Sequence, residues 1–136
     1  MDVHDKHTRS YNMSRIQSRD TKPELVVRSI CHRLGLRFRL HRKDLPGKPD
    51  LVFPKYKTVI FVHGCYWHSH DCKYGIVVPK TNAEFWKKKR DKTKERDSRN
   101  KNELEKLKWQ VITYWECQIK DTNKFVNTIC EDFNLL

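Results

Sequence analysis

Apolar residues in this chain fall into short runs that are typical of β-strands. Lys57 to Val62 and Gln110 to Trp115 are nearly continuous in apolar character, which indicates buried strands. Arg37 to Leu40 alternates with a period of two, and Asp50 to Phe53 resumes as a strand after the turn at Leu45-Pro46-Gly47-Lys48-Pro49. The pattern predicts a sheet in which Lys57 to Val62 is the central strand.

Capping residues and helical spacing predict a helix that begins just after residue 20. Thr21-Lys22-Pro23-Glu24 combines an N-cap threonine, a proline in the first turn and a glutamate at the capping-box position. The apolar stripe that follows ends at Gly35, a residue type that is common after the last helical turn. The predicted stripe consists of Leu25, Val26, Ser29, Ile30, Arg33 and Leu34.

Two further helices are predicted in the second half of the chain. Thr81-Asn82-Ala83-Glu84 indicates a second capping box, so a long helix rich in Lys and Arg should run from there to about Leu107. Asp121 should begin the last helix. The order helix, strands, long helix, strand, helix predicts an α/β domain with a mixed sheet flanked by helices. The apolar residues of the last helix are Phe125, Val126, Ile129 and Phe133.

Length and charge restrict what the chain can be. Its 136 residues suffice for one domain with a core but not for two. Residues 1–20 carry mixed charges and predict an arm, which leaves the domain over residues 21–136. No apolar run has the length of a membrane span or the character of a signal peptide, so we expect an intracellular protein with no membrane partner. A net charge of +12 makes nucleic acid the first candidate partner. The alternative is a basic surface that serves only solubility.

A dense group of metal-ligating residues follows the central strand. Residues 63–72 contain three histidines and two cysteines, and a further cysteine lies just past the next buried strand. Three thiolates and one imidazole form the donor set of a structural zinc site. The candidate ligands are Cys65, Cys72, Cys117 and either His68 or His70. Buried cysteines beside a solvated histidine loop are the alternative, and Cys31 and Cys130 are expected in the core.

Asp50 and two of these histidines suggest a catalytic site. Asp50 follows a tight turn at the start of a strand, and its carboxylate is the kind of hard oxygen ligand that Mg²⁺ takes. The next strand ends at His63, and His68 follows it closely. A metal, a phosphate and an imidazole base could therefore meet there. A turn or capping aspartate is the alternative for Asp50.

Large aromatic side chains and a basic helix could contact a nucleic acid. Tyr66, Trp67 and Trp86 lie near the histidine loop and the start of the long helix, and the residue pattern alone favours a core role for them. Trp109 and Trp115 belong to a strand region and are also expected in the core. A solvated basic face is the alternative for most of the helix cations, which are Lys87, Lys88, Lys89, Arg90, Lys92, Lys94, Arg96 and Arg99.

Longer sequence motifs are spread along nearly the whole chain. They are Asn12-Met13, Arg19-Asp20-Thr21, Leu45-Pro46-Gly47-Lys48-Pro49-Asp50, Val59-Ile60-Phe61, His63-Gly64-Cys65-Tyr66-Trp67-His68, Glu84-Phe85-Trp86, Glu95-Arg96-Asp97 and Trp115-Glu116-Cys117. In this order they resemble the bacterial very short patch repair endonucleases. The resemblance implies a restriction-endonuclease-like fold related to the PD-(D/E)xK nucleases. The second acidic residue and the lysine of that pattern are absent at Ile60-Phe61-Val62-His63. Tyr66 stands where Phe is common in the family, and Lys73 to Pro79 differs in detail.

The resemblance also implies two metal sites. Asp50 and the main-chain carbonyl of Val62 would bind Mg²⁺, and Glu24 would hold a water of the metal cluster. The histidine ligand that the spacing leaves open would be His70. The implied zinc ligands are Cys65, His70, Cys72 and Cys117.

Roles in proton transfer and in DNA contact are implied in the same way. His68 would be the general base, supported by Asp97, and His63 would contact the scissile phosphate. With the resemblance, insertion of the aromatic side chains into the base stack is favoured over a core role. The implied DNA-binding residues are Met13, Tyr66, Trp67, Trp86 and Lys89, of which Lys89 would read the mismatched pair.

The activity implied by the resemblance is strand-specific nicking of duplex DNA on the 5′ side of the mismatched T in T:G pairs that arise from 5-methylcytosine deamination. This nick initiates very short patch repair, which implies a functional link to a cytosine-5 DNA methyltransferase and a repair polymerase. We expect a monomer in the bacterial cytoplasm that associates with the nucleoid through DNA. Two alternatives stay open. One is a zinc-stabilised DNA-binding module without catalysis, and the other is a different nuclease of this fold, such as a restriction enzyme.

Overall fold

The computed structural model describes residues 21–65, 68, 70–72, 75–76 and 81–135. The predicted arm over residues 1–20 lies outside this part of the chain, and so do Met13, Tyr66, Trp67 and most of Lys73 to Pro79.

A mixed sheet of four strands forms the centre of the molecule, in the order β1-β2-β3-β4. β1 (Arg39–Leu40) pairs antiparallel with β2 (Leu51–Phe53), and β2 pairs antiparallel with β3 (Thr58–His63). β3 pairs in parallel with β4 (Gln110–Trp115). The predicted mixed sheet is confirmed. β3 lies one residue later than predicted, and β4 has the predicted bounds but is mostly half-buried rather than buried. β1 and β2 are shorter than their predicted runs.

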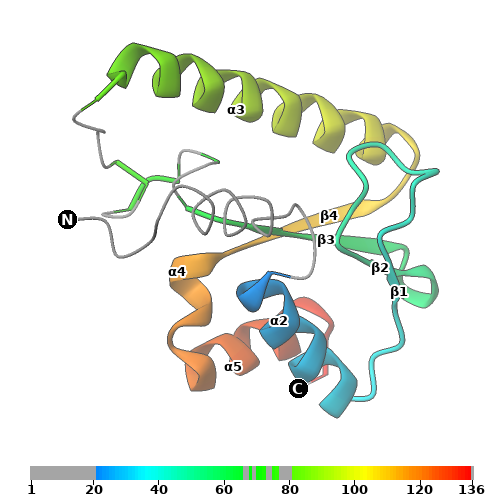
Figure 1. The fold of residues 1–136 in the computed structure, drawn as a ribbon. Helices are drawn as coiled ribbons and strands as arrows, with labels where there is room; N and C mark the ends of the chain where they lie inside the picture. Colours follow the sequence, from blue (N-terminus) through cyan, green and yellow to red (C-terminus); the bar gives the residue numbers. More distant parts are fainter. Residues whose placement is uncertain (1–20, 66–67, 69, 73–74, 77–80, 136) are drawn as a thin grey trace, which may run out of the picture.

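Helices cover both faces of this sheet. They are α2 (Lys22–Arg33), α3 (Ala83–Lys106), α4 (Glu116–Ile119) and α5 (Thr122–Asp132), and a 3₁₀ turn, η1 (Pro54–Tyr56), links β2 to β3. In Figure 1, α2, α4 and α5 lie below the sheet, while α3 crosses above it. The long connection through α3 is what allows β4 to run parallel to β3.

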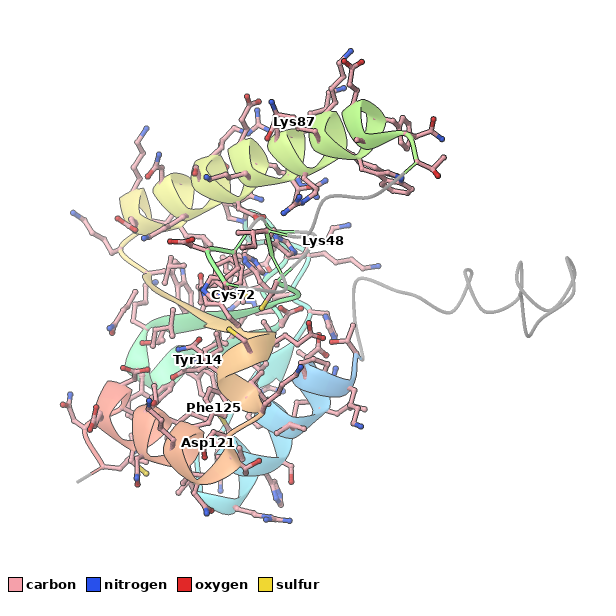
Figure 2. All side chains as sticks on the ribbon, turned by 90° about the vertical axis from the view of Figure 1, so that its left-hand side faces the viewer. Lys48, Cys72, Lys87, Tyr114, Asp121 and Phe125 are labelled. Atoms are coloured by element: carbon pink, nitrogen blue, oxygen red, sulfur yellow. The ribbon has the colours of Figure 1, made fainter. Side chains whose placement is uncertain are left out.

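Alternation along the strands divides the core into two layers. Leu51 and Ile60 point towards the layer of α2 and α5, whereas Val52 and Val59 point to the opposite side. The first layer is much the larger, and it includes Tyr114, whose ring meets Phe125 of α5 edge-on at 4.9 Å (Figure 2). The remaining members of the smaller layer are Leu45, Leu104 and Trp109.

α2 begins as predicted, but it buries a different face. The side chain of Thr21 accepts a hydrogen bond from the backbone N–H of Glu24, which confirms the N-cap. Leu25, predicted for the stripe, is 48% exposed, because the helix is rotated relative to that prediction. Its buried residues are Glu24, Val27, Ile30 and Cys31. A carboxylate therefore stands at the head of an apolar stripe, where burial is costly unless the group has partners.

α3 has the predicted length but lacks the predicted capping box. Its N-cap is Asn82, which adopts a left-handed conformation with φ 54° and makes no side-chain capping hydrogen bond. Because the helix begins at Ala83, Glu84 occupies the second position rather than the third, from which it could complete a box. Of the described residues of this helix, Leu104 is the buried one, so almost all of α3 faces solvent or the cleft below it.

The C-terminal region contains one confirmed and one unexpected element. Asp121 caps α5 by accepting a hydrogen bond from the backbone N–H of Lys124 at 3.3 Å, as its sequence position predicts. The short helix α4 was not predicted, and it carries Cys117 in its first turn. Cys31 and Cys130 are both buried, as expected. Among the described residues, no helix combines the length and the apolar character needed to cross a membrane.

Candidate active site and metal cluster

A cleft of about 1090 Å³ lies between the end of the sheet and α3. The candidate catalytic residues Asp50, His63, His68 and Asp97 all line it, although they come from the residue before β2, from β3, from the following loop and from α3. Glu24 is not among the residues that line it. Cationic side chains surround these groups, and a cleft of this charge attracts a polyanion such as nucleic acid. The cationic lining residues are Lys43, Lys48, Lys94, Arg96 and Lys101.

Asp50 is a buried carboxylate directly before β2. It is 8% exposed, and it accepts a hydrogen bond from the backbone N–H of Val62 at 2.7 Å. Burial raises the pKa of Asp50 to about 8, and the nearby carboxyl of Glu24 contributes to the rise, while the Val62 N–H opposes it. A carboxylate held in this way gains much from a cation.

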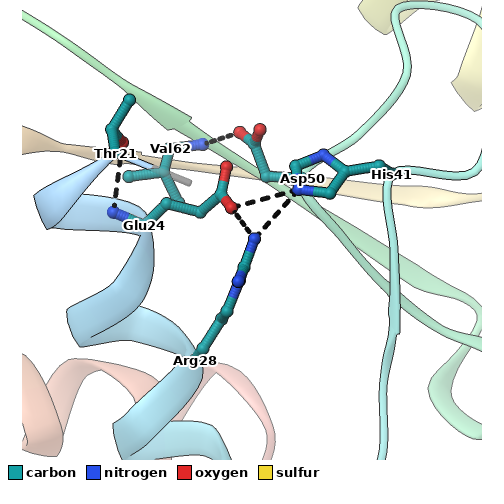
Figure 3. Close-up of polar contacts among 6 residues, drawn as sticks. All are labelled: Thr21, Glu24, Arg28, His41, Asp50 and Val62. Carbon is teal, nitrogen blue, oxygen red and sulfur yellow. Dashed lines mark hydrogen bonds and ion pairs between the residues drawn. The ribbon is translucent and has the colours of Figure 1, made fainter. Parts of the chain in front are cut away.

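Glu24 and two basic residues complete the surroundings of Asp50. Glu24, at the start of α2, is 1% exposed and pairs with Arg28 one turn later (Figure 3). His41 Nε2 lies 3.2 Å from Glu24 Oε2 and 2.9 Å from Arg28 Nη2. Ligand atoms of Glu24, His41 and Asp50 lie within 4.8 Å of one another, so these three residues could hold a metal ion.

His41 is a site residue that the sequence analysis missed. β1 and β2 form a hairpin in which Leu40 faces Leu51, so the next pair outward brings His41 towards Asp50. The backbone N of His41 lies 3.5 Å from the carbonyl oxygen of Asp50, so the two residues are adjacent across the hairpin. The signal was available, because pairing the two predicted strands across the turn would have placed these residues side by side.

Two histidines and an aspartate meet at the other side of the cleft. The rings of His63 and His68 are stacked, with centroids 3.7 Å apart and an angle of 3° between the planes. His68 Nδ1 lies 2.5 Å from Asp97 Oδ2 on α3. This contact fixes the orientation of the His68 ring and leaves its Nε2 available for chemistry.

His63 differs from His68 in its surroundings. It is 8% exposed, and its Nδ1 has no hydrogen-bond partner among the described residues. Burial lowers the pKa of His63 to about 4, and the neighbouring His68 contributes to the lowering, against the charge of Asp97. His63 is therefore neutral near pH 7, with a buried ring nitrogen that lacks a partner.

Three cysteines and a histidine form a second compact cluster. Ligand atoms of all four residues lie within 4.8 Å of one another, and Cys117 Sγ is 3.4 Å from His70 Nδ1. Burial, and then the neighbouring thiols, raise the pKa of the Cys65 thiol to about 12. Three sulfur donors and one imidazole fit a closed tetrahedral metal site. The members are Cys65, His70, Cys72 and Cys117, whereas His68 belongs to a different group of potential ligands with His63 and Asp97.

Trp115 is part of the site rather than of the core, which corrects the sequence expectation. Its ring stacks on His70, with centroids 4.1 Å apart, and meets the ring of His63 edge-on at 5.2 Å. The indole thus connects the metal cluster to the histidine pair. The register of the parallel strands explains its position, because His63 and Trp115 are directly paired at the ends of β3 and β4. Trp109, in contrast, is buried as expected.

The first two turns of α3 present aromatic and cationic side chains. Trp86 is half-buried and meets Phe85 edge-on at 5.0 Å, and Phe85 is 57% exposed. Lys89 Nζ lies 5.6 Å from the Trp86 ring and 5.8 Å from the Phe85 ring. Phe85 was not predicted as a site residue, although it stands beside Trp86 in the sequence. Figure 2 shows this end of α3 projecting beyond the rest of the fold.

Comparison with solved structures supports the nuclease fold. The catalytic domain of the homing endonuclease I-Bth0305I is similar with a TM-score of 0.55 at 21% sequence identity, over 84% of this chain and 94% of that chain. At this level of identity the likeness concerns the fold alone.

Sequence comparison connects the chain to named relatives. The family model for DNA mismatch endonuclease Vsr matches residues 1–74. DNA mismatch endonuclease Vsr of Escherichia coli (strain K12) is 46% identical over 126 residues, which cover 93% of this chain and 80% of the relative. Type II nicking enzyme V.XorIIP of Xanthomonas oryzae pv. oryzae is 46% identical over 83% of this chain and 82% of the relative. The chain belongs to the family of the DNA mismatch endonuclease Vsr.

Proposed function

We propose that this protein is a mismatch endonuclease that nicks duplex DNA on the 5′ side of the mismatched T in a T:G pair. The observation that carries the proposal is the convergence of Asp50, His63, His68 and Asp97 in one cleft with a cationic rim. A carboxylate, imidazoles and surrounding cations are the groups that phosphodiester hydrolysis requires. Relatives named as a mismatch endonuclease and as nicking enzymes support the same activity.

Asp50 and the main-chain carbonyl of Val62 are proposed to hold Mg²⁺. The donor chemistry fits, because Mg²⁺ takes hard oxygen ligands. The N–H of Val62 already points to Asp50, and the N–H and C=O of one strand residue point to the same side, which supports the carbonyl as a second ligand. Glu24, beside Asp50, would hold a metal-bound water. When bound, the cation would stabilise negative charge on the phosphate and on the leaving oxygen.

His68 is proposed as the general base. Its Nδ1 contacts Asp97, so its Nε2 can take the proton of the attacking water, and the carboxylate then stabilises the imidazolium. His63, stacked on His68, has a ring nitrogen without a partner among the described residues, and it could donate a hydrogen bond to the scissile phosphate. The low pKa of His63 keeps it from competing for the proton.

Asp97→Asn tests this orientation of the base. We expect kcat to fall on the order of 10²-fold with little change in KM, because an amide can stabilise neither the tautomer nor the charge of His68 as a carboxylate does. Single-turnover nicking rates would measure the effect. Asp91→Asn, an exposed carboxylate on the same helix, is the matched control and should keep the wild-type rate. Equal rates for the two variants would contradict the proposed role of Asp97.

The cysteine and histidine cluster is proposed to bind Zn²⁺ as a structural ion. Cys65, His70 and Cys72 come from the loop after β3, and Cys117 comes from α4, so one ion would join the ends of two strands. Trp115 stacks on His70 and touches His63. Through these contacts the bound ion would also restrain the positions of the catalytic histidines.

Contact with the DNA is proposed to involve the start of α3 and the region before residue 21. Trp86 would insert into the base stack, a step that costs less at a mismatch than at a paired step. Lys89, beside Trp86, would read the mismatched pair. Met13, Tyr66 and Trp67, which lie outside the described residues, would insert with Trp86, and residues 1–20 would form a DNA-contacting arm attached to a single domain over 21–136.

A nicking assay on three matched duplexes tests the proposed function. T:G, T:A and C:G duplexes of otherwise identical sequence are incubated with Mg²⁺ or with EDTA. We expect one nick, 5′ of the mismatched T, in the T:G duplex with Mg²⁺ only. Binding without a nick in every condition would favour a DNA-binding module, and equal cleavage of all three duplexes would favour a different nuclease.

The cellular setting follows from this activity as part of the proposal. T:G pairs from deaminated 5-methylcytosine connect the enzyme functionally to a cytosine-5 DNA methyltransferase, and the nick would be extended by a repair polymerase. A monomer suits such an asymmetric target. The protein would act in the bacterial cytoplasm, where it would meet the nucleoid through DNA.

A further inference from the structure

His41 has no role in the proposed mechanism, yet it lies against the proposed Mg²⁺ ligand. It follows β1 and adopts a left-handed conformation with φ 50°. A non-glycine residue adopts this conformation at a cost of about 1 kcal/mol. The ring nitrogen Nε2 then lies 3.2 Å from Glu24 Oε2, and it belongs to the same group of potential ligand atoms as Asp50 (Figure 3).

The three side chains offer a mixed donor set. Glu24 and Asp50 supply carboxylate oxygens from buried positions, and His41 supplies an imidazole nitrogen from a half-buried one. Mg²⁺ prefers oxygen ligands alone. An imidazole ligand raises the affinity for first-row divalent metals more than for Mg²⁺. Mn²⁺ is the member of that series that also suits carboxylate ligands, of which this site has two.

Arg28 shows that this position attracts a cation. Its Nη2 contacts Glu24 Oε2 and lies 2.9 Å from His41 Nε2 (Figure 3). A guanidinium has only donors, so this contact requires the tautomer in which His41 Nε2 accepts. In that tautomer the 3.2 Å approach of Nε2 to Glu24 Oε2 brings two acceptors together around the positive charge. The lone pair of Nε2 and the same carboxylate oxygen are what a divalent metal would bind. Arg28 therefore occupies the place of a cation between two of the three potential ligands.

We infer that Glu24, His41 and Asp50 form one divalent-cation site in which His41 is a direct ligand that favours Mn²⁺ over Mg²⁺, and that the Arg28 guanidinium fills this site in the metal-free protein. The inference rests on the proposed function, because Asp50 is the shared ligand. It extends that function by adding a nitrogen ligand, by making Glu24 a direct ligand where the proposed function gives it a metal-bound water, and by adding an internal competitor of the metal.

Metal titration without DNA tests the role of His41. The zinc-loaded protein is titrated with Mn²⁺, free Mn²⁺ is followed by electron paramagnetic resonance, and Mg²⁺ affinity is measured by competition. For His41→Ala we expect the Kd for Mn²⁺ to rise about tenfold or more and the Kd for Mg²⁺ to change by less than about threefold. His32→Ala, an exposed histidine of α2, is the matched control and should bind both ions as the wild type does. Equal changes for the two ions, or none for Mn²⁺, would overturn the role of His41.

Arg28→Gln should change the Kd for Mn²⁺ in the opposite direction from His41→Ala. Removal of the competing positive charge should lower the Kd for Mn²⁺ by about threefold or more, since the metal no longer has to displace it. An unchanged or weaker affinity, in a variant whose circular dichroism matches the wild type, would overturn the role of Arg28.

Asp50→Asn separates failure of this inference from failure of the proposed function. If wild-type protein binds neither ion, both fail. If it binds both ions, loses them with Asp50→Asn and is unaffected by His41→Ala, the cation site of the proposed function stands and the nitrogen ligand is refuted.

Discussion

Asp50→Asn is expected to lower the nicking rate at a T:G mismatch by about 10³-fold or more, because it removes the charged ligand of the proposed catalytic cation. The amide oxygen can still accept the hydrogen bond from the Val62 N–H, so the local fold should persist. Binding of the mismatched duplex, measured by fluorescence anisotropy, should stay within about threefold of wild type. Nicking at more than a tenth of the wild-type rate would contradict the assignment of Asp50.

The same substitution should stabilise the metal-free protein at alkaline pH. Burial raises the pKa of Asp50 from 3.8 to about 8 in the folded chain. Between these values the unfolded chain loses the proton while the folded chain keeps it, so the contribution of Asp50 to stability falls as pH rises from about 4 to about 8. Asparagine does not ionise, so the variant does not lose stability in this way as the pH rises. We therefore expect the free energy of unfolding at pH 8 to rise by a few kcal/mol, the order of magnitude that proton linkage gives for such a difference in pKa.

Urea denaturation in EDTA across this pH range would measure the effect. Asp44→Asn is the matched control, because Asp44 lies in the same hairpin, is 62% exposed and pairs with Arg42 at the surface. That variant should show no stabilisation at pH 8. A lower stability for Asp50→Asn than for wild type at pH 8 would mean that the carboxylate contributes to the fold rather than weakening it.

Cys117→Ala is the second variant with a large expected effect. Loss of one thiolate from the cluster of three cysteines and His70 should abolish tight Zn²⁺ binding. The loop after β3 would lose its connection to α4, and the stacking of Trp115 on His70 would lose its support. We expect a destabilisation of about 3 kcal/mol, a fall in Tm of about 10 °C and loss of nicking, because His68 lies in the same loop.

Zinc content and thermal melting measure this prediction. Elemental analysis should find one zinc per wild-type chain and none in the variant. Cys130→Ala is the matched control, since Cys130 is buried in α5 outside the cluster. It should keep its zinc and lose only about 1 kcal/mol through lost packing. Full zinc occupancy in Cys117→Ala would refute the proposed ligand set.

Much of the fold could be predicted because local signals agree with the tertiary structure. The runs that form β3 and β4 are mostly apolar, and Thr21 and Asp121 cap the helices that they precede. The predicted start of α3 was wrong because Asn82 adopts a left-handed conformation and becomes the N-cap. The helix therefore begins one residue later than the capping-box motif at residues 81–84 predicts. Sequence spacing does not reveal which of two adjacent residues will adopt that conformation.

The site was predicted in part, and the missing residues share one cause. The resemblance implied roles for Asp50, His68 and Asp97, and the structure brings these residues into one cleft. His41 and Trp115 were missed because their positions depend on strand register, which residue type alone does not show. For His41, pairing the two predicted strands across the turn would have supplied that register. Trp115 in particular has the composition of a core residue, and it lies at the site only because it pairs with His63.

The parallel pairing of β3 and β4 has a consequence for synthesis of the protein. Cys117 lies 47 residues after His70, and the strand that supports it leaves the ribosome only after the whole of α3. Until that strand emerges, a nascent chain has its histidines and Asp50 but neither the closing thiolate nor the indole that orders them. Closing so long a loop also slows folding. A chain that is still being translated therefore lacks an assembled site, so cutting of DNA has to wait until β4 is in place.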